Sequence, residues 1–94
     1  MRRAAKIDEN QPILVEAFRR LGCSVLSLAA IGKGVPDLLV ATCGITWLVE
    51  VKIPKGKENQ KQLEFAETWQ GCRAVVRDLE GVETVVKTMR LTVK

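Results

Sequence analysis

Residues 34–52 read GVPDLLVATCGITWLVEVK, and this stretch decides the fold. Two apolar runs, residues 38–42 and 45–51, are separated by the dipeptide Cys43-Gly44. Apolar runs of this length bounded by turn residues are typical of β-strands, and a two-residue connection that contains glycine is typical of a hairpin. The sequence therefore predicts two antiparallel strands joined by a tight turn.

Charged residues mark one end of this hairpin. Asp37 directly precedes the first strand, and the pairing brings it to the end of the second strand, which carries Glu50 and Lys52. Because side chains alternate along a strand, Glu50 and Lys52 share one face, roughly 7 Å apart at about 3.3 Å per residue. Trp47, Val49 and Val51 point to the other face. Burying a carboxylate and an ammonium is costly unless each has a partner.

A divalent cation would provide such a partner. Asp37 and Glu50 offer the hard oxygen ligands that Mg²⁺ and Mn²⁺ prefer, and Val51 could add its main-chain carbonyl. The cation would in turn attract an anionic substrate, which would give Lys52 its partner. Together these residues form the set expected of a metal-dependent phosphodiesterase.

The rest of the chain predicts helices and strands around the hairpin. Leu14, Phe18 and Leu21 recur at helical spacing, while Asn59 and Asp78 are residue types that begin helices. The expected elements are a helix at residues 10–21, a strand at 23–30, the two hairpin strands, a helix at 60–69, a strand at 73–77 and a helix at 78–89. Their order, αβββαβα, indicates an α/β fold in a single domain that covers residues 1–94.

Apolar side chains of the helix at residues 60–69 are expected to face the core. They are Leu63, Ala66 and Trp69. Trp47 is also expected in the core. The alternative for both tryptophans is a platform on which nucleic-acid bases stack.

The charge balance favours a polyanionic partner. The chain has 15 Lys and Arg against 11 Asp and Glu, a formal net charge of +4. Lys33, Lys55, Lys57 and Lys61 are candidates for contacts with phosphate. The alternative is that these lysines only keep the surface soluble.

Missing residue types narrow the chemistry further. The chain has no histidine, which excludes histidine-based acid-base catalysis, and no tyrosine, which excludes a tyrosyl intermediate. Three cysteines without a CxxC spacing indicate reduced thiols. No apolar run approaches the roughly 18 residues of a membrane span, and the start MRRAAK is not followed by a signal-peptide core. We therefore expect a cytoplasmic protein with no membrane partner and no small-molecule cofactor beyond the metal.

The string GVPDLLV, then WLVEVK, then a lysine-rich loop and a helix with QLEF resembles the virus-type replication-repair nuclease (VRR-NUC) family of the PD-(D/E)xK superfamily. The resemblance covers nearly the whole chain, and the lack of further domains is similar to the stand-alone phage and prophage members. It implies a restriction-endonuclease-like fold, with a mixed four-stranded sheet flanked by helices. It also implies a Mg²⁺- or Mn²⁺-dependent nuclease that acts on branched DNA, as a homodimer that resolves four-way (Holliday) junctions.

The same resemblance implies roles for individual residues. Asp37 and Glu50 would bind metal, Lys52 would position or activate water, and Gln62 on the following helix would support the site. Gln11 stands where the superfamily often places a metal-facing glutamate in the first helix. Its neighbours Glu9 and Glu16 are less well phased, and the contribution of this helix is left open.

Other classes of function remain as alternatives. The chain could be a DNA-binding module or subunit that keeps the nuclease fold without cutting, or a flap-type repair nuclease with a single site. A structural or interaction protein is a third alternative, and its positive charge should be scattered rather than gathered around Lys33, Lys52 and Lys55.

Overall fold

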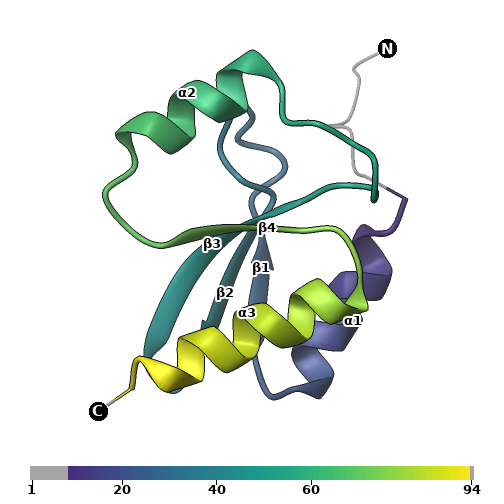
Figure 1. Cartoon of the computed structure of the whole chain (residues 1–94), viewed down its shortest axis with the longest axis vertical. Helices are drawn as coiled ribbons and strands as arrows, with labels where there is room; N and C mark the ends of the chain where they lie inside the picture. Colours follow the sequence, from purple (N-terminus) through teal and green to yellow (C-terminus); the bar gives the residue numbers. More distant parts are fainter. Residues whose placement is uncertain (1–8, 94) are drawn as a thin grey trace.

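The computed structural model of the protein describes residues 9–93 and has the expected order of elements (Figure 1). These are α1 (Gln11–Arg20), β1 (Ser24–Ser27), β2 (Leu38–Thr42), β3 (Ile45–Val51), α2 (Gln60–Thr68), β4 (Arg73–Val76) and α3 (Leu79–Leu91). Within residues 9–93, no helix has the length and apolar character needed to cross a bilayer.

The four strands form one mixed sheet in the order β1-β2-β3-β4, as the family resemblance implied. The first three strands are antiparallel, and β3 pairs with β4 in parallel. In the predicted hairpin, Leu38 lies opposite Val49 and Thr42 opposite Ile45. Cys43 and Gly44 both have positive φ, 54° and 78°, as a two-residue turn of this kind requires. The hairpin prediction is therefore confirmed.

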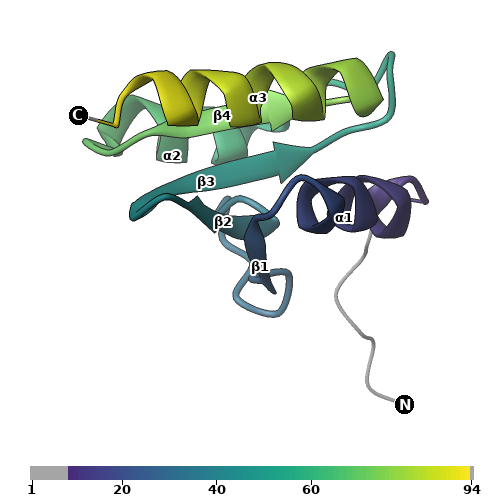
Figure 2. The same cartoon turned by 90° about the horizontal axis from the view of Figure 1, so that it is seen from below.

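The core lies between the sheet and the helices α1 and α3, which contact each other and pack on one face (Figure 2). Its members are Leu14, Phe18, Cys23, Val25, Leu38, Val40, Val49, Val51, Val76, Val82, Val85, Val86 and Met89. Asp78 caps α3 by accepting a hydrogen bond from the N–H of Gly81 at 2.8 Å, as predicted from its residue type. Val49 and Val51 point into this core, so Glu50 between them points to the opposite face of the sheet.

Helix α2 differs from the prediction. It lies apart from α1 and α3 (Figure 1) and contains no buried residue. Leu63 and Trp69 are 47% and 44% exposed, so the expectation that they face the core is wrong. The ring of Trp69 stacks instead on that of Phe65, with centroids 5.3 Å apart. Trp47, by contrast, packs half-buried against the core.

The first strand is also shorter than predicted. It ends at Ser27, and residues 29–31 form a turn in place of the expected continuation to Ala30. The N–H of Leu28 still bonds the carbonyl of Asp37 at 2.6 Å, and the chain then turns away from β2, with the N–H of Ile31 bonding the carbonyl of Leu28 at 3.0 Å. The turn lets residues 29–36 form a loop beside the charged end of the hairpin.

Candidate functional site

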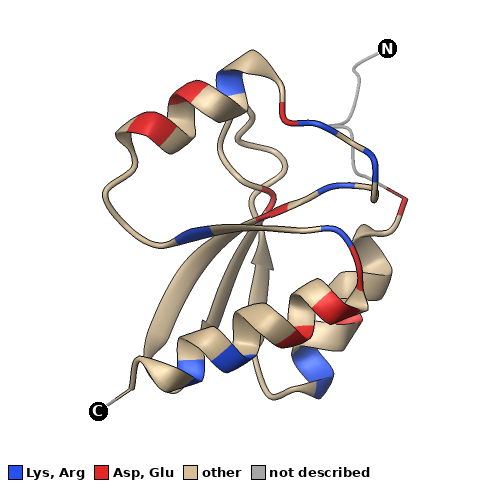
Figure 3. Ribbon diagram, in the orientation of Figure 1, with Lys and Arg blue, Asp and Glu red and all other residues tan. Residues whose placement is uncertain are grey.

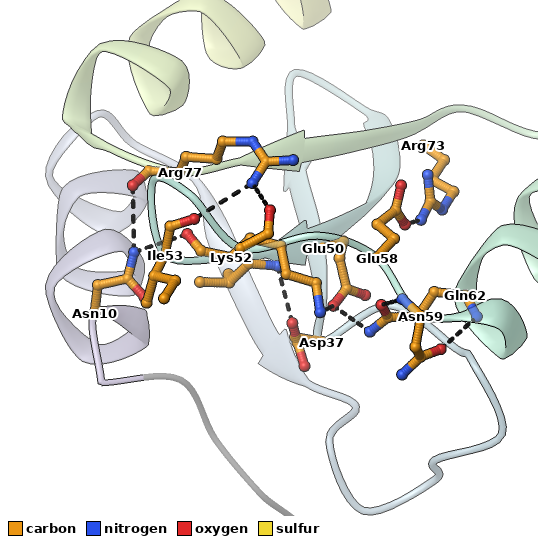
Figure 4. A network of polar contacts seen from close by, with 12 residues as sticks. Asn10, Asp37, Glu50, Lys52, Ile53, Glu58, Asn59, Gln62, Arg73 and Arg77 are labelled. Atoms are coloured by element: carbon orange, nitrogen blue, oxygen red, sulfur yellow. Dashed lines mark hydrogen bonds and ion pairs between the residues drawn. The ribbon is translucent and has the colours of Figure 1, made fainter.

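Asp37 and Glu50 meet at the end of the hairpin, on the side away from the core (Figure 4). Asp37 stands one residue before β2, after the buried Pro36. Its Oδ2 accepts a hydrogen bond from the main-chain N–H of Val51 at 2.9 Å. This bond holds the Asp37 carboxylate against β3, beside Glu50.

Glu50 is almost completely buried, with 1% of its surface exposed. Its two carboxylate oxygens have different surroundings. Oε2 accepts a hydrogen bond from Nε2 of Gln62 at 2.7 Å and lies 3.6 Å from Nζ of Lys52. Oε1 is buried and has no hydrogen-bond partner. The structure thus brings together the four predicted catalytic residues, Asp37, Glu50, Lys52 and Gln62.

The surroundings of Glu50 disfavour a negative charge. Burial, and then the neighbouring carboxylate of Asp37, raise its pKa from 4.5 to about 8, against the opposing effect of Lys52 and Arg73. A further positive charge beside Glu50 would favour its ionised form at neutral pH.

This donor set fits a divalent cation. Oε1 of Glu50 is a buried acceptor without a partner, and Asp37 supplies a second carboxylate beside it. No group of three or more His, Cys, Asp or Glu residues that could hold a metal occurs in the part of the chain that the structure describes. A site with two carboxylates suits Mg²⁺, which usually keeps several waters. Val51 takes part through its N–H, which bonds Asp37, and its carbonyl stays a predicted ligand.

Helix α2 reaches the site through its first turn. Asn59 is the N-cap of this helix, and its Oδ1 accepts a hydrogen bond from the N–H of Gln62 at 2.9 Å. Oε1 of Gln62 accepts in return from the N–H of Asn59 at 2.8 Å. This reciprocal arrangement is a capping box, and it leaves Nε2 of Gln62 directed at Glu50. The sequence indicated the cap but not its link to the site.

Two of the four candidate phosphate-binding lysines border the site. Lys33 and Lys61 line a cavity of about 310 Å³ together with Asp37, Asn59 and Gln62. The loop that carries Lys33 lies against α2 at Gly34, where φ is +83° and an added Cβ would be 2.3 Å from the carbonyl oxygen of Lys61. Only glycine allows this close approach.

Lys55 and Lys57 lie outside that cavity, on the exposed connection between β3 and α2, where Figure 3 shows a run of basic segments. Two arginines fix this connection to β4. Arg73 forms an ion pair with Glu58, and Arg77 bonds the carbonyls of Ile53, at 3.3 Å, and Gly56. The sequence did not predict this role for either arginine, because arginines beside a strand are common and most have no such contact.

The first helix contributes differently from the expectation. Glu16 is exposed and pairs with Arg20, and Glu9 is also exposed, so neither contacts the carboxylate pair. Gln11 is buried, and its Oε1 has no hydrogen-bond partner. Asn10, the N-cap of the helix, contacts the main chain beside the site instead, since its Nδ2 donates to the carbonyl of Lys52 at 3.0 Å. Asn10 was missed because its residue type indicated only a helix start.

Comparison with known proteins supports the family that the sequence motifs resemble. No model of a known protein family matches the sequence, and no curated protein matches it. A solved structure described as a VRR_NUC domain superposes with a TM-score of 0.68 at 32% sequence identity. The match covers 82% of this chain and 89% of that one.

Proposed function

The chain belongs to the VRR-NUC family and has its nuclease domain, and from this premise we propose that it is a Mg²⁺- or Mn²⁺-dependent endonuclease that cuts branched DNA. The observation that carries the proposal is the buried carboxylate of Glu50 next to that of Asp37, with Lys52 beside it, 3.6 Å from Glu50. We further propose that the substrate is the four-way junction and that the active form is a homodimer.

The chemistry we propose is hydrolysis of a phosphodiester. Asp37 and Glu50 would hold the cation, and Oε1 of Glu50 is the oxygen left free for it. A bound divalent ion polarises a phosphoryl oxygen and lowers the pKa of a bound water. Gln62 keeps the other Glu50 oxygen in place by its 2.7 Å hydrogen bond.

Lys52 has a separate part in this scheme. Its side chain is 15% exposed, so it stands at the edge of the site rather than in open solvent. There it can orient the attacking water or stabilise the charge that develops on the phosphate. Its main chain is held from both sides, because the N–H bonds Val76 and the carbonyl accepts from Asn10.

The lysines around the site would hold the DNA backbone. Lys33 and Lys61 line the cavity that contains Asp37, and Lys55 and Lys57 lie on the neighbouring connection. Phosphate contacts of this kind position a nucleic acid without reading its sequence. This agrees with an enzyme that selects DNA by its branched shape.

A homodimer would match the symmetry of the substrate. A four-way junction has approximate twofold symmetry and needs two symmetric nicks, and two copies of a chain most often pair about a twofold axis. A small domain also buries little apolar surface alone. Ile13 and Leu79, which are 60% and 53% exposed, are examples of apolar surface that a partner could cover.

The principal alternative is a DNA-binding module without cleavage. The carboxylate pair argues against it, because two carboxylates placed toward a polyanion would weaken binding unless a cation joined them. A flap-type nuclease with a single site is the second alternative, and it differs in substrate rather than in chemistry.

One assay separates these functions. Labelled four-way junction, flap and linear duplex DNA are incubated with the protein in Mg²⁺, Mn²⁺ or EDTA. We expect paired incisions in the junction with either metal and none in EDTA. Asp37→Ala and Glu50→Ala should abolish cleavage but retain DNA binding. Binding without any cleavage would support the DNA-binding module, and cleavage of flaps alone would support the repair nuclease.

A further inference from the structure

Gln62 can donate a hydrogen bond to Glu50 in only one of the two possible orientations of its side-chain amide. The NH₂ group must face the carboxylate, because a carbonyl oxygen in that place would repel it. Nε2 donates to Oε2 of Glu50 at 2.7 Å, and Oε1 accepts from the N–H of Asn59 at 2.8 Å. The bond to Asn59 therefore fixes which end of the amide Glu50 meets.

Asn59 makes that N–H available by capping the helix. Its backbone is extended, with φ −85° and ψ 176°, and its Oδ1 accepts from the N–H of Gln62 at 2.9 Å. No residue of α2 is buried, so its first turn is held by contacts at its cap, at Glu50 and at Gly34 rather than by burial of apolar side chains. The turn that carries Gln62 therefore depends on its cap more than a helix in a core would.

The result is a division between the two oxygens of Glu50. Both polar contacts, from Gln62 and from Lys52, are made to Oε2. Oε1 stays buried and has no hydrogen-bond partner. If the Gln62 amide turned over or its helical turn frayed, Glu50 would lose the hydrogen bond to Oε2. That bond fixes the orientation of the carboxylate and so keeps Oε1 available for the proposed cation.

We propose that Asn59 is a positioning residue of the cation site, acting through Gln62 on the Glu50 carboxylate. The inference rests on the proposed metal dependence. It assigns to the cap of α2 a function beyond starting the helix: the cap sets the affinity of Glu50 and Asp37 for the divalent ion.

The test measures Mn²⁺ binding directly, by isothermal titration of the intact protein without DNA. Asn59→Ala removes the cap, and we expect about 10-fold weaker Mn²⁺ binding, the usual effect of losing a group that orients a metal ligand. Asn59→Ser, which caps a helix without adding charge, should restore most of the affinity. In cleavage assays over a range of DNA concentrations, Asn59→Ala should lower kcat and leave KM for DNA unchanged.

Asp78→Ala is the matched control. It deletes the cap of α3, whose side chain makes the same kind of bond to Gly81 at 2.8 Å but faces no candidate ligand. This variant should lose thermal stability without a change in Mn²⁺ affinity. Equal effects of the two cap deletions on Mn²⁺ affinity would overturn the proposal, because general destabilisation would then explain both.

A double variant keeps the proposal testable if Asn59→Ala loosens α2 more widely. Gln62→Met removes the bond to Glu50, so adding Asn59→Ala to it should cause no further loss of Mn²⁺ affinity if the two act in series. Additive losses would contradict the proposal. Wild-type protein that binds no Mn²⁺ would overturn the metal dependence itself, whereas unchanged binding in Asn59→Ala would overturn only the role of Asn59.

Discussion

The stability of the protein without a bound cation should fall as the pH rises through the neutral range, because of Glu50. Its folded-state pKa is raised from 4.5 to about 8 by burial and by Asp37. Between these two values the folded protein holds a proton that the unfolded chain has released. The stabilisation is therefore fully present below about pH 4.5 and is lost as the pH rises toward 8.

The size of the effect follows from the proton count. One proton per molecule changes the free energy of unfolding by about 1.4 kcal/mol per pH unit, which amounts to about 2.5 kcal/mol between pH 5.5 and 7.5. The chain has no histidine, the side chain that ordinarily titrates in this range. Urea unfolding in EDTA at a series of pH values measures the loss directly.

Two variants isolate Glu50 in this experiment. Glu50→Gln cannot release the proton, so its free energy of unfolding should be nearly flat between pH 5.5 and 7.5. Glu16→Gln changes an exposed carboxylate and should keep the wild-type slope. Saturating Mn²⁺ should restore stability at pH 7.5, because it binds the ionised form. An equal slope in wild type and Glu50→Gln would refute the reasoning.

Three further predictions test the site and its surroundings. Lys52→Ala should lower the cleavage rate with little loss of DNA affinity, whereas Lys55→Ala should weaken binding and reduce its salt dependence; a Lys52→Ala enzyme that only binds worse would make Lys52 an ordinary phosphate contact. Gly34→Ala should destabilise the protein and slow cleavage more than Gly32→Ala, because both residues have positive φ but only Gly34 lies against α2; equal melting temperatures would contradict this. Light scattering at micromolar concentration should give about twice the 10.4 kDa chain mass, and a monomer would exclude the dimer proposal.

The positions of the site residues on the hairpin, Asp37, Glu50 and Lys52, could be predicted from the sequence. Strand alternation put Glu50 and Lys52 on one face, and a two-residue turn fixed the hairpin register, so the position of Asp37 followed from covalent geometry. The structure shows this pairing directly, with Asp37 bonded to Val51 at 2.9 Å. Local sequence was sufficient for this prediction because a two-residue turn sets the pairing of every residue in the hairpin.

The position of α2, which carries Gln62, could not be predicted in the same way. Apolar positions at helical spacing predicted that Leu63 and Trp69 face a core, but spacing says only that these residues share a face, not that the sheet covers it. Two contacts place α2: the Gln62 amide donates to Glu50 on the sheet, and the loop at Gly34 lies against the Lys61 carbonyl. Such contacts join residues far apart in the chain and leave no periodic signal.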